Sequence, residues 1–155
     1  MIPKVDLTDL TIAVVDDEKT IVDLVSGLLT ALGAKKVHKA TSADQVLNIL
    51  VYPNEKIDCI VSDHGMEPVT GLELLQKIRV GRNPAMNRNV RFLMLTAHGD
   101  VDVVKRAMAL DVDAYVIKPV SMSSLETALN RAFARKRILS AVSHYASLPL
   151  APPST

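Results

Sequence analysis

The chain has 155 residues, 48% of them hydrophobic, so it is long enough to bury the core of one globular domain but too short for two ordinary ones. Its formal net charge is +1, from 18 basic and 17 acidic residues, which excludes an overall field that would recruit nucleic acid or an anionic membrane. Aromatic residues make up only 3% of the chain, which argues against a surface built to stack bases or bind carbohydrate.

The cysteine content and the N-terminus bear on where the protein works. Cys59 is the single cysteine and lies in an apolar run, which excludes an internal disulfide and predicts core packing. The N-terminus has no basic segment followed by a long apolar stretch, and no window reaches the roughly 18 apolar residues of a membrane span. We therefore predict a soluble, cytoplasmic protein.

Short apolar runs rich in β-branched residues alternate with longer stretches of helical periodicity, a pattern typical of βα units around a parallel sheet. In chain order the predicted strands are TIAVV (11–15), KVHKA (36–40), IDCIV (57–61), RFLML (91–95) and AYVI (114–117). Four of these runs are nearly continuous in apolar character, as expected for strands covered on both faces. The run 36–40 alternates with lysines and is predicted to be an edge strand.

The first two predicted helices follow the strands 11–15 and 36–40. The apolar residues of the first recur at helical spacing and stop at Gly33, a natural helix end; they are Ile21, Leu24, Val25, Leu28 and Leu32. The second is predicted to begin after a Ser42 cap, with Gln45 three residues further on, and to end before Pro53.

Three more helices are predicted in the second half of the chain. The third covers residues 71–80 and is followed by a long, polar, arginine-rich segment that we predict to be an exposed loop. The fourth covers 100–110 with Asp100 as its cap, and the fifth starts at a capping box of Ser123 and Glu126. Apolar spacing continues after Arg137, so the fifth helix is expected to run past that residue.

Together these elements predict an α/β fold of five βα units. Each connection between strands exceeds the dozen or so residues that a parallel crossover needs. We therefore expect a three-layer α/β/α sandwich around a five-stranded parallel sheet. Residues 1–9 are predicted to form an N-terminal extension, 10–139 the domain, and 140–155 a C-terminal tail whose proline-rich end is disordered.

Polar residues follow the predicted strands at the edge of the sheet where open parallel sheets bind ligands. Asp16 and Asp17 follow the first strand, Asp63 the third, Thr96 the fourth and Lys118 the fifth. Two like charges about 4 Å apart repel by roughly 4 kcal/mol at an effective dielectric near 20, and one lysine does not balance three carboxylates. A hard divalent cation does, and Mg²⁺ prefers all-oxygen ligands of this kind. The pattern predicts a site for a metal and an oxyanion.

Each of these residues also has a simpler structural explanation. Asp16 or Asp17 could cap the first helix, Thr96 could merely end a strand, and Lys118 could belong to an ordinary turn. Asp63 is the hardest to explain in this way, because it follows directly on buried apolar residues. The conjunction of all five on one predicted edge favours the functional interpretation.

Four segments in order resemble the receiver domain of two-component response regulators, and in length its stand-alone chemotaxis-type members. They are VVDDE (14–18), VSDHGMEPVTG (61–71), LMLTAHG (93–99) and AYVIKPV (114–120), within a resemblance that spans about residues 10–137. The resemblance implies the flavodoxin-like strand order 2-1-3-4-5, for which a member of this family is a standard example.

The resemblance also implies chemistry. Asp63 would accept a phosphoryl group from a phosphohistidine on a histidine kinase or a histidine phosphotransfer protein. Asp17, Asp63 and the backbone carbonyl of Gly65 would be the Mg²⁺ ligands, with Asp16 acting through water. Phosphoryl transfer depends mainly on in-line positioning and on neutralising the phosphoryl oxygens, which suits this set of residues.

Two further residues would link phosphorylation to output. Lys118 and the Thr96 hydroxyl would contact the phosphoryl oxygens of Asp63. Thr96 would then move inward, and Tyr115 would occupy the space it leaves, which alters the surface of helix four, strand five and helix five for a downstream protein target. The simpler alternative is that Tyr115 is a half-buried strand residue with its hydroxyl at the surface.

The sequence departs from the family at several positions. Glu67 stands where the family usually has proline, with Pro68 one residue later. Gly65 and His98 occupy places that in the family tune the hydrolysis of the acyl phosphate. His98 would either bind near the phosphoryl group or be a solvated loop residue, and we expect the latter. Pro119 in the family usually follows a cis peptide bond.

Two other classes of protein share part of this pattern. In the best-known Mg²⁺-dependent phosphohydrolases the aspartate nucleophile follows the first strand in a DxD pattern, whereas here adjacent aspartates do. A mononucleotide or flavin module needs a glycine-rich loop at that place, where DDE repels phosphate. We expect a non-enzymatic signalling protein, monomeric or weakly dimeric, with protein partners and no nucleic acid or membrane partner.

Overall fold

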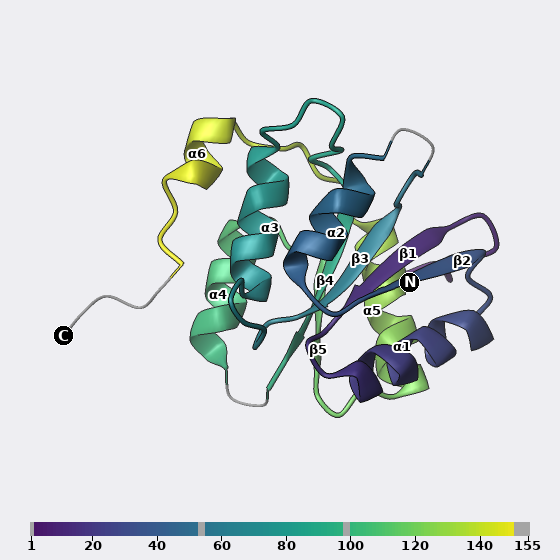
Figure 1. The fold of residues 1–155 in the computed structure, drawn as a ribbon. Coiled ribbons are helices and arrows are strands. Elements are labelled where there is room, and N and C mark those ends of the chain that lie inside the picture. The colour runs from purple at the N-terminus through teal and green to yellow at the C-terminus, as the bar shows by residue number, and fades with distance from the viewer. Residues whose placement is uncertain (1, 53–54, 98–99, 151–155) are drawn as a thin grey trace.

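Five parallel strands form a single sheet in the order β2-β1-β3-β4-β5 (Figure 1). In this computed structural model, which describes residues 2–52, 55–97 and 100–150, the strands are β1 (Thr11–Val15), β2 (Lys36–Ala40), β3 (Cys59–Asp63), β4 (Arg91–Thr96) and β5 (Ala114–Ile117). The predicted α/β class, flavodoxin-like strand order and edge position of β2 are confirmed.

Helices cover both faces of the sheet and produce the predicted three layers (Figure 1). They are α1 (Lys19–Ala31), α2 (Ala43–Leu50), α3 (Gly71–Val80), α4 (Val101–Ala109), α5 (Met122–Ala134) and the short α6 (Val142–Ala146). Helices α1 and α5 enclose one hydrophobic core with one face of the sheet, and α2, α3 and α4 enclose a second core with the other face.

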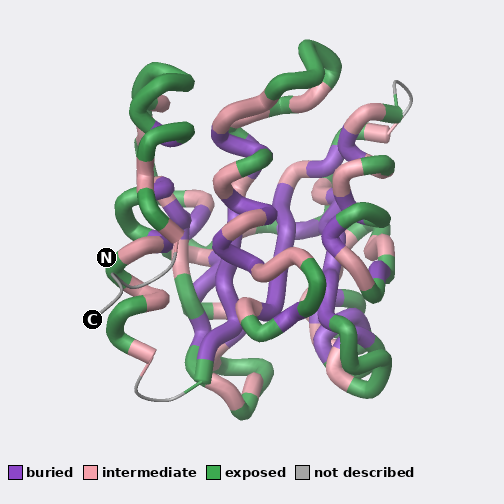
Figure 2. The backbone as a smooth tube through the Cα atoms, turned by 60° about the vertical axis from the view of Figure 1, so that its left-hand side comes forward, coloured by how far each residue is buried: buried purple, intermediate pink, exposed green. Residues whose placement is uncertain are grey.

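Burial is greatest in the central strands, which run through the middle of the molecule in Figure 2. Every residue of β1 and β3 is buried, including Cys59, as predicted. Strand β5 differs from the prediction that it is covered on both faces, because it is the second edge of the sheet. Its Tyr115 and Ile117 side chains are 46% and 44% exposed.

Helix boundaries agree with the sequence where the signal is local. Helix α1 is followed by Gly33, which adopts a φ of 104°, and the Ser42 side chain accepts a hydrogen bond from the Gln45 amide at the start of α2. Pro53 lies outside the described residues. Asp100 occupies the cap position of α4, but its side chain makes no capping hydrogen bond with the residues described, contrary to the prediction.

Helix α5 was predicted wrongly at both ends. Its capping box joins Ser121 and Ser124, because Ser121 is the extended residue that precedes the first helical turn, and the predicted box of Ser123 and Glu126 does not form. The helix ends at Ala134 and does not run past Arg137. The chain leaves the helical path at an extended Arg135, and Arg137 then forms an ion pair with buried Asp113.

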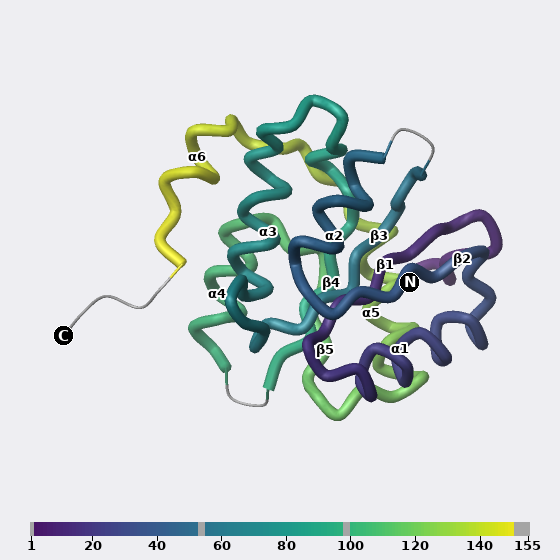
Figure 3. Tube along the Cα trace, in the orientation of Figure 1, coloured from purple at the N-terminus to yellow at the C-terminus, as the bar shows by residue number. Residues whose placement is uncertain are grey.

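The segment 135–150 returns across the domain and contains α6, which lies beside α3 (Figure 3). The loop 81–90 is largely exposed, as predicted. Residues 151–155 lie outside the described part of the chain, so disorder at the end of the tail stays a prediction.

Candidate functional site

The parallel topology brings five of the predicted site residues to one edge of the sheet. Asp16 and Asp17 follow β1, Asp63 and Thr96 are the last residues of β3 and β4, and Lys118 follows β5. One carboxylate oxygen from each of Asp16, Asp17 and Asp63 lies within 4.8 Å of the others. The predicted cluster of three carboxylates is therefore present.

Asp16 uses its two carboxylate oxygens differently. Oδ1 accepts a hydrogen bond of 2.8 Å from the Glu18 amide, which fixes the turn before α1. Oδ2 is buried and has no hydrogen-bond partner among the described residues. Burial raises the pKa of Asp16 above its usual value, and the nearby charge of Asp63 raises it further, against the opposing effect of the Glu18 hydrogen bond.

Lys118 is the only cation of the described residues that pairs with this cluster. Its Nζ lies 2.7 Å from Asp63 Oδ1 and 3.6 Å from Asp16 Oδ2. Burial by itself lowers the pKa of Lys118, but the hydrogen bond to Asp63 and the two carboxylate charges outweigh it, so that the pKa is raised. One ammonium faces three carboxylates, so the site retains an excess of negative charge.

The donor set fits Mg²⁺. A buried carboxylate oxygen without a hydrogen-bond partner is costly unless a cation lies close, and Asp16 Oδ2 has, among the described residues, only the Lys118 ammonium at 3.6 Å, which lies closer to Asp63. All the clustered donors are hard oxygens, which Mg²⁺ prefers. The backbone at Gly65 also lies close, because a Cβ added there would stand 3.4 Å from Asp63 Oδ2. Asp16, Asp17 and Asp63 thus offer clustered carboxylate oxygens to such an ion, and Gly65 lies beside them.

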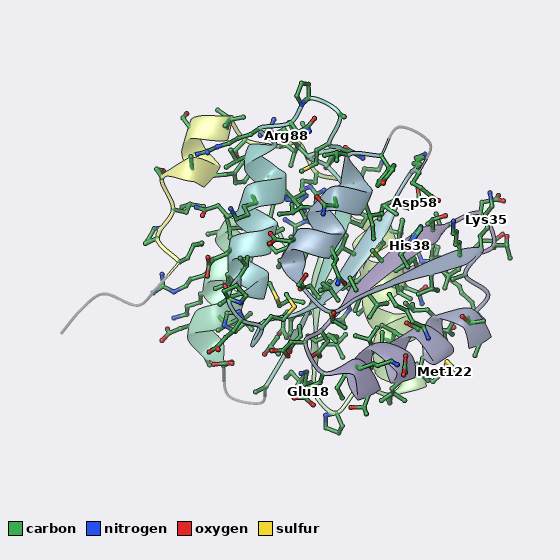
Figure 4. The ribbon with its side chains drawn as sticks, viewed as in Figure 1. Glu18, Lys35, His38, Asp58, Arg88 and Met122 are labelled. Atoms are coloured by element: carbon green, nitrogen blue, oxygen red, sulfur yellow. The ribbon has the colours of Figure 1, made fainter. Side chains whose placement is uncertain are left out.

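A cleft of about 470 Å³ opens over the cluster. Its lining consists of Asp17, Glu18, Asp63, His64, Gly65, Leu95, Thr96, Ala97, Asp100 and Lys118. Glu18, at the carboxyl end of β1 in Figure 4, and Asp100 were not predicted to belong to the site. Both residues follow strands that end at the same edge of the sheet, so their positions were predictable, but Asp100 was predicted only as a cap and Glu18 was given no role.

A larger groove of about 550 Å³ lies between α2, α3 and the C-terminal segment. Glu73 is the only acidic residue of its lining, which is otherwise mostly apolar or amide. The chemistry of the chain is therefore concentrated in the smaller cleft.

Gly71, eight residues after Asp63, is required by packing beneath the site. A Cβ at this position would lie 2.5 Å from the Asp63 carbonyl oxygen and 2.9 Å from His64 Cα, both of which are backbone atoms. The Gly71 amide donates a 3.0 Å hydrogen bond to the His64 carbonyl, so the loop after β3 closes tightly onto the start of α3. This closure fixes the backbone that carries Asp63.

Thr96 and Tyr115 are in place but separate. Thr96 is buried, and its hydroxyl donates a 3.0 Å hydrogen bond to the Ala97 carbonyl. Tyr115 lies on β5 with its side chain about half exposed. The structure therefore has the Tyr115 side chain directed outward, at the surface.

The structure places the residues around Glu67, where the sequence departs from the family. Glu67 is exposed and precedes Pro68 through a cis peptide bond, and Met66 is buried as packing. The expected cis bond before Pro119 is present. His98 lies outside the described residues.

Comparison with known proteins decides the family. Residues 12–130 match the response regulator receiver domain. The chain belongs to this family. It is 30% identical over 122 residues to a probable chemotaxis protein CheY of Rhizobium etli, covering 79% of this chain and 91% of that protein. It is 28% identical over 116 residues to a chemotaxis protein CheY homologue of Campylobacter jejuni, covering 75% and 86%.

A solved structure agrees with the sequence relatives. The receiver domain protein of Clostridium thermocellum superposes with a TM-score of 0.70 at 31% identity, covering 79% of this chain and 93% of that one. The chain is therefore a CheY-like receiver of two-component signalling, which sets aside the phosphohydrolase and flavin alternatives. In the described part of the chain, none of the helices is long and apolar enough to cross a membrane.

Proposed function

We propose that this receiver domain accepts a phosphoryl group on Asp63 from a histidine kinase or a histidine phosphotransfer protein, in a Mg²⁺-dependent reaction. The observation that carries the proposal is the position of Asp63. It ends a buried strand, faces the cleft, pairs with Lys118 at 2.7 Å and lies within 4.8 Å of two other carboxylates. A carboxylate placed at this cost is explained by chemistry rather than by folding.

The residues divide the reaction between them. Lys118 holds Asp63 Oδ1, which leaves Oδ2, on the side of Gly65, to attack phosphorus. The new oxygen–phosphorus bond forms as the nitrogen–phosphorus bond of the donor phosphohistidine breaks, and the imidazole leaves with its electron pair. Held by Asp17, Asp63 and the Gly65 carbonyl, with Asp16 through water, Mg²⁺ would supply positive charge to the phosphoryl oxygens.

Output follows from residues beside the site. The Thr96 hydroxyl gives up its bond to the Ala97 carbonyl and donates to a phosphoryl oxygen, and Tyr115 moves inward. The surface concerned is rich in exposed apolar side chains: Val101, Met108, Tyr115, Ile117 and Met122. A downstream protein target would dock there, because exposed apolar groups gathered on one surface mark interaction sites.

The remaining assignments are part of the same proposal. The protein works in the cytoplasm as a monomer or weak homodimer, with protein partners and neither nucleic acid nor membrane. Residues 10–139 form the receiver domain, between an extension at 1–9 and a tail at 140–155.

The proposal is tested by intact mass after incubation with acetyl phosphate and Mg²⁺. The wild-type protein should gain one phosphoryl group, and Asp63→Asn should gain none. Asp58→Asn is the matched control, because Asp58 lies next to the opposite end of β3 and Asn keeps the oxygen that accepts from the Thr11 amide. A phosphoryl gain that persists in Asp63→Asn would reject the assignment, and chelation of Mg²⁺ should abolish the gain.

A further inference from the structure

The segment that follows α5, residues 135–150, is anchored to the domain at three places, and we call it the C-terminal strap. The first anchor is at the base of β4 and β5. Arg137 pairs with Asp113, and Tyr145 is fully buried. The Tyr145 hydroxyl donates to Asp111 at 2.7 Å and accepts from the Ser140 amide at 2.9 Å. Buried, fully paired polar groups of this kind hold a segment in one position.

The second anchor is on α3. The Gln76 side-chain amide donates to two strap carbonyls, those of Tyr145 at 2.9 Å and Leu148 at 3.1 Å. Arg88, labelled in Figure 4 where the loop after α3 meets the strap, donates to the Ser140 carbonyl and stands 6.0 Å over the Tyr145 ring. These contacts hold the strap along the outer side of α3 (Figure 1).

The third anchor is on α4. The Arg106 guanidinium donates a 2.9 Å hydrogen bond to the Pro149 carbonyl. Helix α4 has few other anchors among the described residues: Ala107 is the only buried residue within it, Val103 packs partly against the core, its first turn lacks a side-chain cap, and buried Leu110 follows its end. A helix with few buried residues shifts or opens at a low free energy, so one contact with the strap changes its preferred position measurably.

We infer that the C-terminal strap is a regulatory element that holds α4 in the position seen with Tyr115 outside, and that it loosens when the receiver is activated. The inference rests on the proposed function, in which α4 belongs to the output surface. A contact made to α4 in one state and lost in the other shifts the equilibrium toward the first. By linkage, activation must weaken the strap by the same factor by which the strap opposes activation.

Hydrogen exchange of the unphosphorylated full-length chain tests whether the strap stabilises α4. Gln76→Glu replaces the donating amide with a carboxylate that faces two carbonyl oxygens. Gln45→Glu is the matched control, because Gln45 uses only its Oε1 as an acceptor, from the Thr41 amide and hydroxyl, and a carboxylate keeps that oxygen. Arg106→Gln serves as a second variant that breaks the α4 contact alone.

We expect Gln76→Glu to speed exchange on the order of tenfold in both 142–150 and 101–109, the effect of losing two hydrogen bonds. Arg106→Gln should speed exchange in 101–109, and Gln45→Glu should leave both segments as in the wild type. If exchange in 101–109 stays at the control value in Gln76→Glu and in Arg106→Gln, the strap has no hold on α4 and the inference is overturned.

Linkage is tested by adding the phosphoryl mimic beryllofluoride with Mg²⁺ to the wild-type chain. Exchange in 142–150 should rise, and unchanged exchange in a chain shown to bind the mimic would refute the coupling. If the proposed function is wrong, intact mass shows no gain of a phosphoryl group. The hydrogen-exchange comparison of the variants uses the unmodified chain, so it still decides whether the strap holds α4.

Discussion

Asp16, Asp63 and Lys118 show how single residues are set for different tasks by their surroundings. One oxygen of Asp16 accepts a hydrogen bond from the Glu18 amide, and the other is buried without a hydrogen-bond partner among the described residues. Asp63 has the closer contact with Lys118, at 2.7 Å against 3.6 Å for Asp16. The shorter pair orients the carboxylate that we propose reacts, and the buried, poorly paired one is suited to hold positive charge nearby.

A first prediction concerns Asp16 without magnesium. Because its pKa is raised in the folded state, the folded chain binds the proton more tightly than the unfolded chain, and stability falls as pH rises through that raised pKa. Asp16→Asn keeps the acceptor for Glu18 and removes the charge. It should add on the order of 1 kcal/mol at neutral pH, because burying a neutral amide costs less than burying a carboxylate that is also repelled by Asp63, with a smaller gain in acid.

Urea unfolding at several pH values in Mg²⁺-free buffer measures this. Asp23→Asn, at a surface ion pair with Lys39, is the control and should change stability little. A neutral-pH loss of stability in Asp16→Asn would contradict the assigned role.

A second prediction concerns Asp17 and the metal. At a Mg²⁺ concentration of about 100 times its dissociation constant, binding should stabilise the chain by roughly 2.7 kcal/mol and raise Tm by roughly 5–10 °C. Asp17→Asn should lose most of this rise, whereas Asp23→Asn should retain it. Thermal scans with and without Mg²⁺ check this, and an equal rise in Asp17→Asn would remove Asp17 from the ligand set.

Helices and strands were predictable where their signals are local. The end of α1 before Gly33 and the Ser42 cap of α2 depend on residues a few positions apart, and both are confirmed. The end of α5 was missed, because the chain leaves the helical path at Arg135 and brings Arg137 to Asp113, a partner 24 residues earlier that no local pattern reveals. The exposure of β5 was also missed, because it depends on the position of the strand at the edge of the sheet and not on its apolar sequence.

The element-level prediction concerns the base of β4 and β5. The Asp113 carboxylate is buried and pairs with Arg79, Arg91 and Arg137, of which Arg79 is also fully buried. Asp113→Ala should cost about 3–5 kcal/mol, because it leaves a buried guanidinium without its counter-charge. Asp23→Ala breaks an exposed pair and should cost at most about 1 kcal/mol. Urea unfolding measures the free energy of unfolding of both variants, and similar losses would show that the buried cluster stabilises the fold no more than an exposed pair.

At the scale of the whole molecule, topology explains why the site was predictable. Five parallel strands must end at one edge, so polar residues after successive strands converge whatever the details of packing. The carboxylate cluster was found in this way. Glu18 and Asp100 in the cleft, and the path of the C-terminal strap, were not, because they depend on loop geometry and on side-chain pairs far apart in sequence.

The most direct test of the central claim is to locate the phosphoryl group. Borohydride reduces an aspartyl phosphate to homoserine, so peptide mapping after treatment with acetyl phosphate, Mg²⁺ and borohydride reports which carboxylate reacted. We predict homoserine at position 63 alone. Homoserine at Asp16, Asp17 or Asp100, or no homoserine in a chain that had gained a phosphoryl group, would contradict the account.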